Sequence, residues 1–166
     1  CLHQEDKLYG IALIDISTGE FFTGQGDKEH IDKILQNFSP GELIFSKSRK
    51  KEWAERFQNQ FPVFTMDEWV FTEDFTKELL LKHFKVVSLK GFGIQEMNAA
   101  IIAAGAALHY IGETRQDQLK HISGITRIEA DNYVWLDKFT IRNLELIHSS
   151  NENAVTLIDV IDHTHT

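Results

Sequence analysis

The stretch LYGIALIDISTGEFFTG, Leu8–Gly24, decides the fold predicted for this chain. An apolar run from Leu8 to Ile16 leads into the small polar turn Ser17-Thr18-Gly19, after which Glu20–Thr23 returns as a second strand. β-Branched and aromatic residues on both sides of a turn that ends in glycine predict a β-hairpin. Because Leu8–Ile14 is apolar at successive positions rather than at alternate ones, we expect a central strand with helices on both faces of its sheet.

Helical and extended patterns alternate after this hairpin, which indicates an α/β fold. A first strand that ends near Gln4 would complete an antiparallel meander, and Asp27 is a natural N-cap for the next helix. The remaining expected elements are strands at Glu42–Phe45 and Val63–Thr65 and helices after Ser48, over Asp74–Phe84 and over Gln95–Ile111. The last helix is rich in Ala and Gly, so we expect it to pack closely against the hairpin strand.

A polar stretch at Thr114–Lys120 predicts a domain boundary. We expect an α/β domain over residues 1–120, a linker over 121–130, and the incomplete start of a helical domain over 131–166. The expected elements beyond the boundary are short strands at Ile125–Ile128 and Tyr133–Leu136, an amphipathic helix at Lys138–His148 and a helix that begins at Thr156.

Composition is that of an ordinary globular protein, with 42% hydrophobic and 25% charged residues. The net charge of −8 disfavours tight binding of nucleic acid by this chain alone, because phosphate binding needs a basic face. The single cysteine, Cys1, excludes an internal disulfide, and the longest apolar run, Ala99–Leu108, is far shorter than the ~20 residues of a membrane span. We expect a cytoplasmic protein, and a chain without an initiator Met suggests a piece of a longer one.

Asp15, at the end of the hairpin strand, is the one residue that suggests an enzyme. In ribonuclease-H-like nucleases an aspartate on the first strands holds Mg²⁺, but two or three further carboxylates must converge on it. The next acids, Glu20 and Asp27, lie on the return strand and at a helix start. A strand-end Asp followed by Ser, Thr and Gly more often caps a turn, so we interpret Asp15 as a turn residue. A metal-dependent nuclease that uses Asp15 is the alternative.

Other candidate chemistry is weaker. The segment Asp15–Gly19 is similar to the Asp-x-Gly-Thr phosphate hairpin of actin-like ATPases, but Ser17 replaces the glycine that lets phosphate approach. The chain has no phosphate-loop motif, no nucleophile elbow and no clustered His and Cys ligands. The only basic cluster, at residues 47–51, is typical of a solvated helix start. We therefore expect no catalytic, cofactor-binding or metal-binding residues, and a binding or connecting module rather than an enzyme.

Several motifs together resemble the MutS family of DNA mismatch repair proteins in order and spacing. The resemblance extends over essentially the whole chain, and its most specific part is the last, where the family enters its core domain. The motifs are ALIDISTGEF, SPGELIFS, LKGFGI, AAGAALHYIGETRQDQLKHI, YVWLDKFTIRNLELI and TLIDVIDHTHT.

The resemblance implies that residues 1–120 form the family's connector domain, a ribonuclease-H-like α/β fold without catalytic activity, followed by the start of the helical core domain. It implies a module that couples the mismatch-reading and ATPase parts of a homodimeric bacterial protein. Mismatched DNA, ATP and Mg²⁺ would then bind elsewhere in that protein. Family members dock MutL near the helix before the Gly-Phe-Gly turn, here Asp74–Phe84, so the implied contact residues are Lys77, Glu78 and Lys82.

Overall fold

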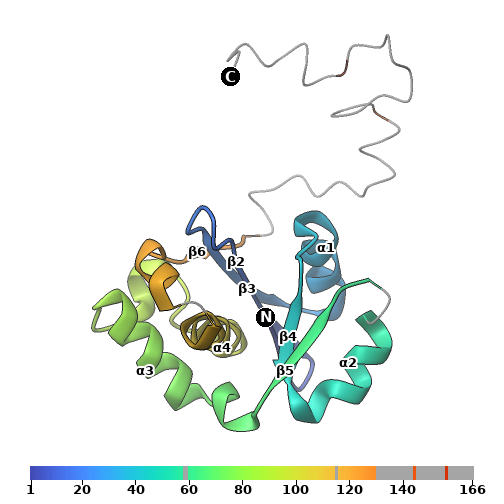
Figure 1. The fold of residues 1–166 in the computed structure, drawn as a ribbon, viewed down its shortest axis with the longest axis horizontal. Helices are drawn as coiled ribbons and strands as arrows, with labels where there is room; N and C mark the ends of the chain where they lie inside the picture. Colours follow the sequence, from blue (N-terminus) through green and yellow to red (C-terminus); the bar gives the residue numbers. More distant parts are fainter. Residues whose placement is uncertain (58–59, 115, 130–143, 145–155, 157–166) are drawn as a thin grey trace.

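A mixed α/β arrangement surrounds a central antiparallel meander in the computed structural model, which describes residues 1–57, 60–114, 116–129, 144 and 156 (Figure 1). Strands β1 (Leu2–Glu5), β2 (Leu8–Ile14) and β3 (Phe21–Gly26) pair antiparallel in that order. This confirms the predicted hairpin and the meander. A parallel pair, β4 (Leu43–Ser46) and β5 (Val63–Met66), lies beside it, with β4 in contact with β1.

The strand β2 ends at Ile14, whereas the sequence pattern had indicated an end at Ile16. The Asp15 amide donates to the Glu20 carbonyl, and the Gly19 amide donates to the Asp15 carbonyl, each at 2.9 Å. Gly19 has φ of 78°, a left-handed conformation that glycine adopts without steric cost. The turn therefore begins two residues earlier than the apolar pattern suggested.

Four helices flank the sheet in the described part of the chain. Asp27 caps the first of them, since its Oδ1 accepts the His30 amide at 2.8 Å, as predicted. The last helix begins and ends three residues later than expected. The bounds are α1 Lys28–Phe38, α2 Lys50–Phe57, α3 Glu73–Phe84 and α4 Asn98–Thr114, with short 3₁₀ turns η1 Lys47–Arg49, η2 Glu68–Phe71, η3 Leu89–Phe92 and η4 Gln116–His121.

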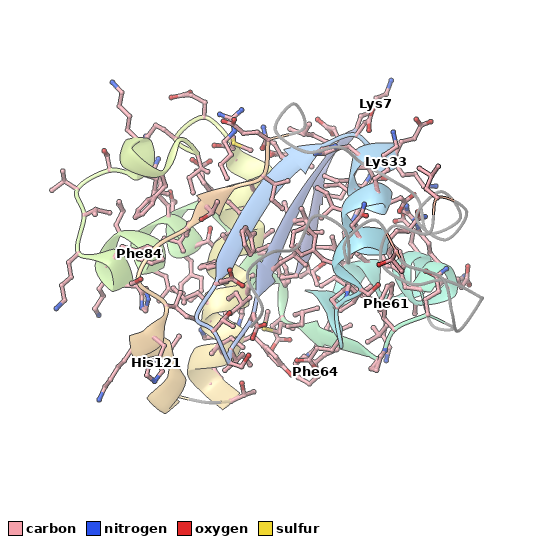
Figure 2. All side chains as sticks on the ribbon, turned by 90° about the horizontal axis from the view of Figure 1, so that it is seen from above. Lys7, Lys33, Phe61, Phe64, Phe84 and His121 are labelled. Carbon is pink, nitrogen blue, oxygen red and sulfur yellow. The ribbon has the colours of Figure 1, made fainter. Side chains whose placement is uncertain are left out.

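Both faces of the meander are buried, as the continuous apolar run of β2 predicted. On one face α4 and α3 cover Ala12 and Phe21, and Phe84 lies on this side in Figure 2. On the other face α1 and α2 cover Leu2 and Ile11, and Phe61 lies on that side. The alternation of β2 side chains between two cores holds the sheet between two helical layers.

The helix α4 lies directly on β2, as its small residues predicted. A Cβ added to Gly10 would stand 1.9 Å from the Ala99 carbonyl oxygen, so no side chain fits between strand and helix at this point. The Thr23 hydroxyl, fully buried, contacts the Ile11 carbonyl at 2.8 Å and the Ala100 carbonyl at 3.2 Å. This polar contact joins β2, β3 and α4 within an apolar layer.

The chain after α4 folds back onto the same unit. Strand β6 (Thr126–Arg127) pairs parallel with β3, and Ile122, Ile125 and Ile128 are buried. The His83 Nε2 donates to the Ile122 carbonyl at 2.8 Å, which ties this segment to α3. Residues 122–129 lie within the segment expected as a linker, 121–130, and are packed on the α/β unit. The division of the chain into domains stays a prediction. The expected elements from Tyr133 onward fall, apart from Leu144 and Thr156, outside the described residues.

We expect Gly10→Ala to destabilise the fold, because the new methyl group would overlap the Ala99 carbonyl unless α4 moves away from β2. Overpacking of this kind typically costs about 1–3 kcal/mol in the free energy of unfolding, measured by chemical denaturation. Gly91→Ala is the matched control, since a Cβ there meets nothing within 4 Å. Equal stability of the two variants would contradict the close approach of α4 to β2.

Candidate functional site

The Asp15 carboxylate is engaged inside its own turn. Its Oδ1 accepts the Ser17 amide at 2.8 Å, the Ser17 hydroxyl at 2.6 Å and the Thr18 amide at 3.4 Å. The Ser17 hydroxyl, and then its amide, hold the pKa of the exposed Asp15 carboxyl below its ordinary value. These contacts are those of an Asx turn, which is the structural role predicted for Asp15.

Among the described residues, no set of acids converges on Asp15. A groove of about 830 Å³ extends from the end of β2 to the residues before β4, and it is lined by Asp15, Glu20 and Glu42. Across the described residues, no three His, Cys, Asp or Glu side chains are arranged so that they could hold a metal ion. The Glu42 carboxylate instead accepts the Tyr110 hydroxyl at 3.2 Å. The residues that the structure describes around Asp15 do not fit the metal site of a nuclease.

A separate polar cavity of about 180 Å³ lies at the carboxyl end of β4, beside β1, and the carboxyl ends of strands are where α/β sheets usually bind ligands. His3, Ser46, Arg49 and Glu68 line it. Only one of these is a carboxylate, and its Oε1 already accepts the Ser48 amide at 2.7 Å. The cavity therefore lacks the paired carboxylates that metal-assisted hydrolysis needs.

Burial and, after it, the nearby Arg49 guanidinium lower the pKa of His3 to about 4, against the opposing effect of Glu68. The neutral imidazole stacks on Phe71 with ring centroids 6.0 Å apart. His3 is thus a neutral packing residue at physiological pH.

The stability of the chain should depend on pH through His3. Below the ordinary pKa of 6.5 the unfolded chain binds a proton at His3, whereas the folded chain does so only near pH 4. The free energy of unfolding should therefore fall by on the order of 2 kcal/mol between these pH values. In His3→Phe, which keeps a ring against Phe71, this fall in the free energy of unfolding should be absent from denaturation curves recorded across that pH range. Parallel pH profiles for both proteins would contradict a neutral, buried His3.

The helix α3 presents a charged outer face. Thr76 and Leu80 are fully buried on its inner side, with Thr76 packed on Gly105 of α4. Of the predicted contact residues, Glu78 and Lys82 lie on the opposite side, and Lys77 lies at the edge of the buried face. Lys77 is half-buried, and its Nζ lies 3.8 Å from Oε1 of Glu73, one turn earlier. Glu78 and Lys82 are exposed and lie four residues apart. Neither of them forms an ion pair within the described chain. Whether a partner touches these residues stays a prediction.

A family model of MutS domain II matches residues 1–123 of this chain. The chain belongs to the MutS domain II family. It is 52% identical over 158 residues to the DNA mismatch repair protein MutS of Flavobacterium psychrophilum, which covers 95% of this chain and 18% of that protein. The MutS of Cytophaga hutchinsonii is 50% identical over 98% of this chain and 19% of that protein, and the MutS of Parabacteroides distasonis is 45% identical over the same shares.

This MutS domain II chain spans about a fifth of the length of the curated relatives it matches. The resemblance inferred from the sequence motifs is thereby confirmed at the level of the family. None of the helices in the described part of the chain is long and apolar enough to cross a membrane.

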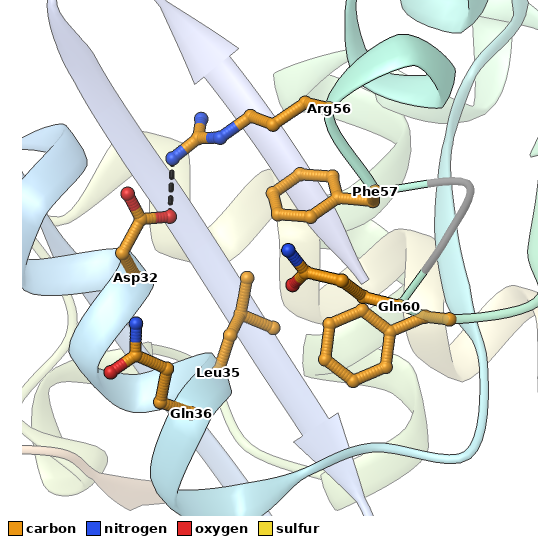
Figure 3. Close-up of a pocket in the computed structure, with 7 residues that line it drawn as sticks. Asp32, Leu35, Gln36, Arg56, Phe57 and Gln60 are labelled. Atoms are coloured by element: carbon orange, nitrogen blue, oxygen red, sulfur yellow. Dashed lines mark hydrogen bonds and ion pairs between the residues drawn. The ribbon is translucent and has the colours of Figure 1, made fainter. Parts of the chain in front are cut away.

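The MutS domain II chain also has a small pocket of about 160 Å³ between α1 and α2 (Figure 3). Arg56 of α2 forms an ion pair with Asp32 of α1, and its guanidinium carbon lies 4.8 Å from the centre of the Phe57 ring. The Arg56 guanidinium is therefore already engaged by two side chains of this chain, the Asp32 carboxylate and the Phe57 ring. We interpret the pocket as a joint between the helices rather than as a ligand site.

An exposed aromatic cluster at the start of α3 was not predicted from the sequence of this MutS domain II chain. Trp69 of η2 is 54% exposed, although its neighbours Val70 and Phe71 are buried. Its ring packs against Phe75 of α3 and His109 of α4. The segment Trp69-Val70-Phe71 is apolar throughout, and a pattern of three residues cannot show which ring stays at the surface.

Proposed function

We propose that this chain is the connector domain of a bacterial, cytoplasmic MutS-type mismatch repair protein. It would link the mismatch-reading domain to the ATP-binding part of a homodimeric protein and transmit changes of state between them. The single observation that carries this proposal is the MutS domain II match over residues 1–123, joined to about 50% identity with MutS proteins along nearly the whole chain.

The proposed fold type is ribonuclease-H-like. Supporting it are the antiparallel meander β1–β2–β3, the adjoining parallel pair β4–β5 and helices on both faces of the sheet. The domain would be non-catalytic, because Asp15 is engaged in its turn and the strand-end cavity has one carboxylate. In this proposal ATP and Mg²⁺ bind other domains, and mismatched DNA is held mainly by them, since this chain carries a net charge of −8.

The non-catalytic role predicts no Mg²⁺-dependent cleavage of DNA or RNA by this chain. Residual cleavage, if found in a preparation, should be the same for Asp15→Asn, because Asp15 only caps a turn. Gel assays with labelled single-stranded and double-stranded substrates measure this directly. Cleavage that disappears with Asp15→Asn would favour the alternative function, a ribonuclease-H-like nuclease that uses Asp15.

The outer face of α3 is the proposed docking surface for MutL. Supporting this are the exposed Glu78 and Lys82 and the fixed position of the helix, whose Thr76 and Leu80 pack on the core. A helix with one face buried and the opposite face exposed has a defined orientation, which a docking partner requires.

We expect Glu78→Lys combined with Lys82→Glu to weaken crosslinking of MutL to a full-length MutS protein that carries this chain. The double exchange leaves the net charge unchanged but reverses the charge pattern that MutL would meet, so electrostatic complementarity is lost. The measurement is the yield of the MutS–MutL crosslink on mismatched DNA with ATP.

The matched control is Lys51→Glu with Glu55→Lys, which exchanges two exposed charges four residues apart on α2. Figure 1 shows α2 and α3 on opposite sides of the molecule. Crosslinking should therefore survive in the control. Equal yields for both double variants would remove the outer face of α3 from the docking proposal.

A further inference from the structure

The aromatic cluster of Trp69, Phe75 and His109, here called the Trp69 cluster, is exposed and yet fixed in position. The Trp69 ring centroid lies 5.0 Å from that of Phe75 and 5.3 Å from that of His109, at interplanar angles of 72° and 69°. Phe75 and His109 are themselves 5.3 Å apart at 85°. Edge-to-face packing of this kind is favourable for aromatic rings, so the indole is held before any partner arrives.

The backbone under the Trp69 cluster is also held. The Thr72 hydroxyl donates to the Trp69 carbonyl at 2.9 Å, and the buried side chains of Val70 and Phe71 anchor η2 in the core. The cluster thus joins η2, α3 and α4. A side chain that is exposed over 54% of its surface but fixed by three elements loses little conformational entropy on binding.

Negative charge borders the Trp69 cluster along α3. Asp74 and Glu78 are exposed and lie four residues apart on α3, and Glu78 lies one helical turn after Phe75. Within the described chain neither forms an ion pair, whereas Glu73 lies 3.8 Å from the Lys77 ammonium and Asp67 is paired with Lys47. Within the described chain, the exposed carboxylates of α3 without an ion pair, Asp74 and Glu78, thus outnumber the one exposed ammonium of this helix without an ion pair, that of Lys82.

We propose that the Trp69 cluster is the anchor of the α3 docking surface and that it receives an arginine or lysine side chain of MutL. This inference rests on the proposed docking role of α3 and names the contact that dominates it. A cation is attracted to an indole ring and, through charge-assisted hydrogen bonds, to neighbouring carboxylates. Asp74 and Glu78 supply those carboxylates, so the site is complementary to a basic segment of the partner.

The proposal ranks the residues of the docking surface. Exposed charge pairs contribute little to affinity, whereas tryptophan is among the residues that most often dominate an interface. Trp69 should therefore matter more than Glu78 and Lys82. Charge complementarity should also make the complex weaker as salt rises.

The test is the dissociation constant of MutL from the full-length protein that carries this chain, measured by titration at low and at high salt. Trp69→Ala should weaken binding about tenfold or more, the usual effect of losing an anchor residue. Trp69→Phe, which keeps a ring against Phe75 and His109, should retain part of the affinity. Phe38→Ala is the matched control, because Phe38 is also 41% exposed and packs on one ring, that of Phe22, but lies on α1.

A second variant tests the cation directly and leaves the packing unchanged. Asp74→Asn with Glu78→Gln should weaken binding at low salt and reduce its dependence on salt. Unaltered salt dependence would overturn the assignment of a cationic side chain. Wild-type affinity for Trp69→Ala, with weaker binding by the Glu78→Lys, Lys82→Glu variant, would overturn the anchor and leave the docking face intact. Wild-type affinity for all variants would overturn the docking proposal itself.

Discussion

The contact between the backbone of α4 and β2 is the constraint on which the rest of this structure depends. Gly10 faces the Ala99 carbonyl with no room for a side chain, and Gly105 faces Thr76 of α3, where an added Cβ would stand 2.3 Å from the Thr76 Cβ. Strand, helix and next helix are thus stacked at distances set by backbone atoms. Because backbone contacts have fewer ways to relax than long side chains, this half of the core holds its parts in fixed relative positions.

Two polar places at the surface lie at the ends of packed strands. Asp15 ends β2 and satisfies itself within a turn, and the polar cavity at the carboxyl end of β4, beside β1, contains His3 kept neutral by burial. Within the part of the chain that the structure describes, neither place brings together three side chains that could hold a metal ion. The outward-facing features of α3, in contrast, rest on a rigid base.

Much of the fold could be predicted from the sequence because its signals are local. The hairpin follows from its turn chemistry, the start of α1 from the capping Asp27, and the packing of α4 from its run of small residues. Other features depend on distant contacts that no local pattern encodes. Strand β6 lies within the strand expected at Ile125–Ile128, but its parallel pairing with the distant β3 could not be predicted. The start of α4 at Asn98 has no capping side chain among its hydrogen bonds, so its position could not be fixed to within a turn.

The candidate site divides in the same way. That Asp15 would cap a turn was predictable, because Ser, Thr and Gly follow it directly. The strand-end cavity was not, since His3, Ser46 and Glu68 are brought together only by the sheet. The exposure of the Trp69 ring could not be predicted from local sequence either. Its neighbours are apolar, so the sequence suggests a core residue, and only the placement of η2 over α3 and α4 leaves its ring at the surface.

The pairing of β6 with β3 ties the end of the described segment to the central sheet. The two strands run parallel, and the Ile128 amide donates to the Thr23 carbonyl at 2.7 Å, one residue before the described segment ends at Glu129. The same Thr23 donates, through its hydroxyl, to the Ala100 carbonyl of α4. One residue of β3 thus joins the end of the described segment to the helix that supports α3.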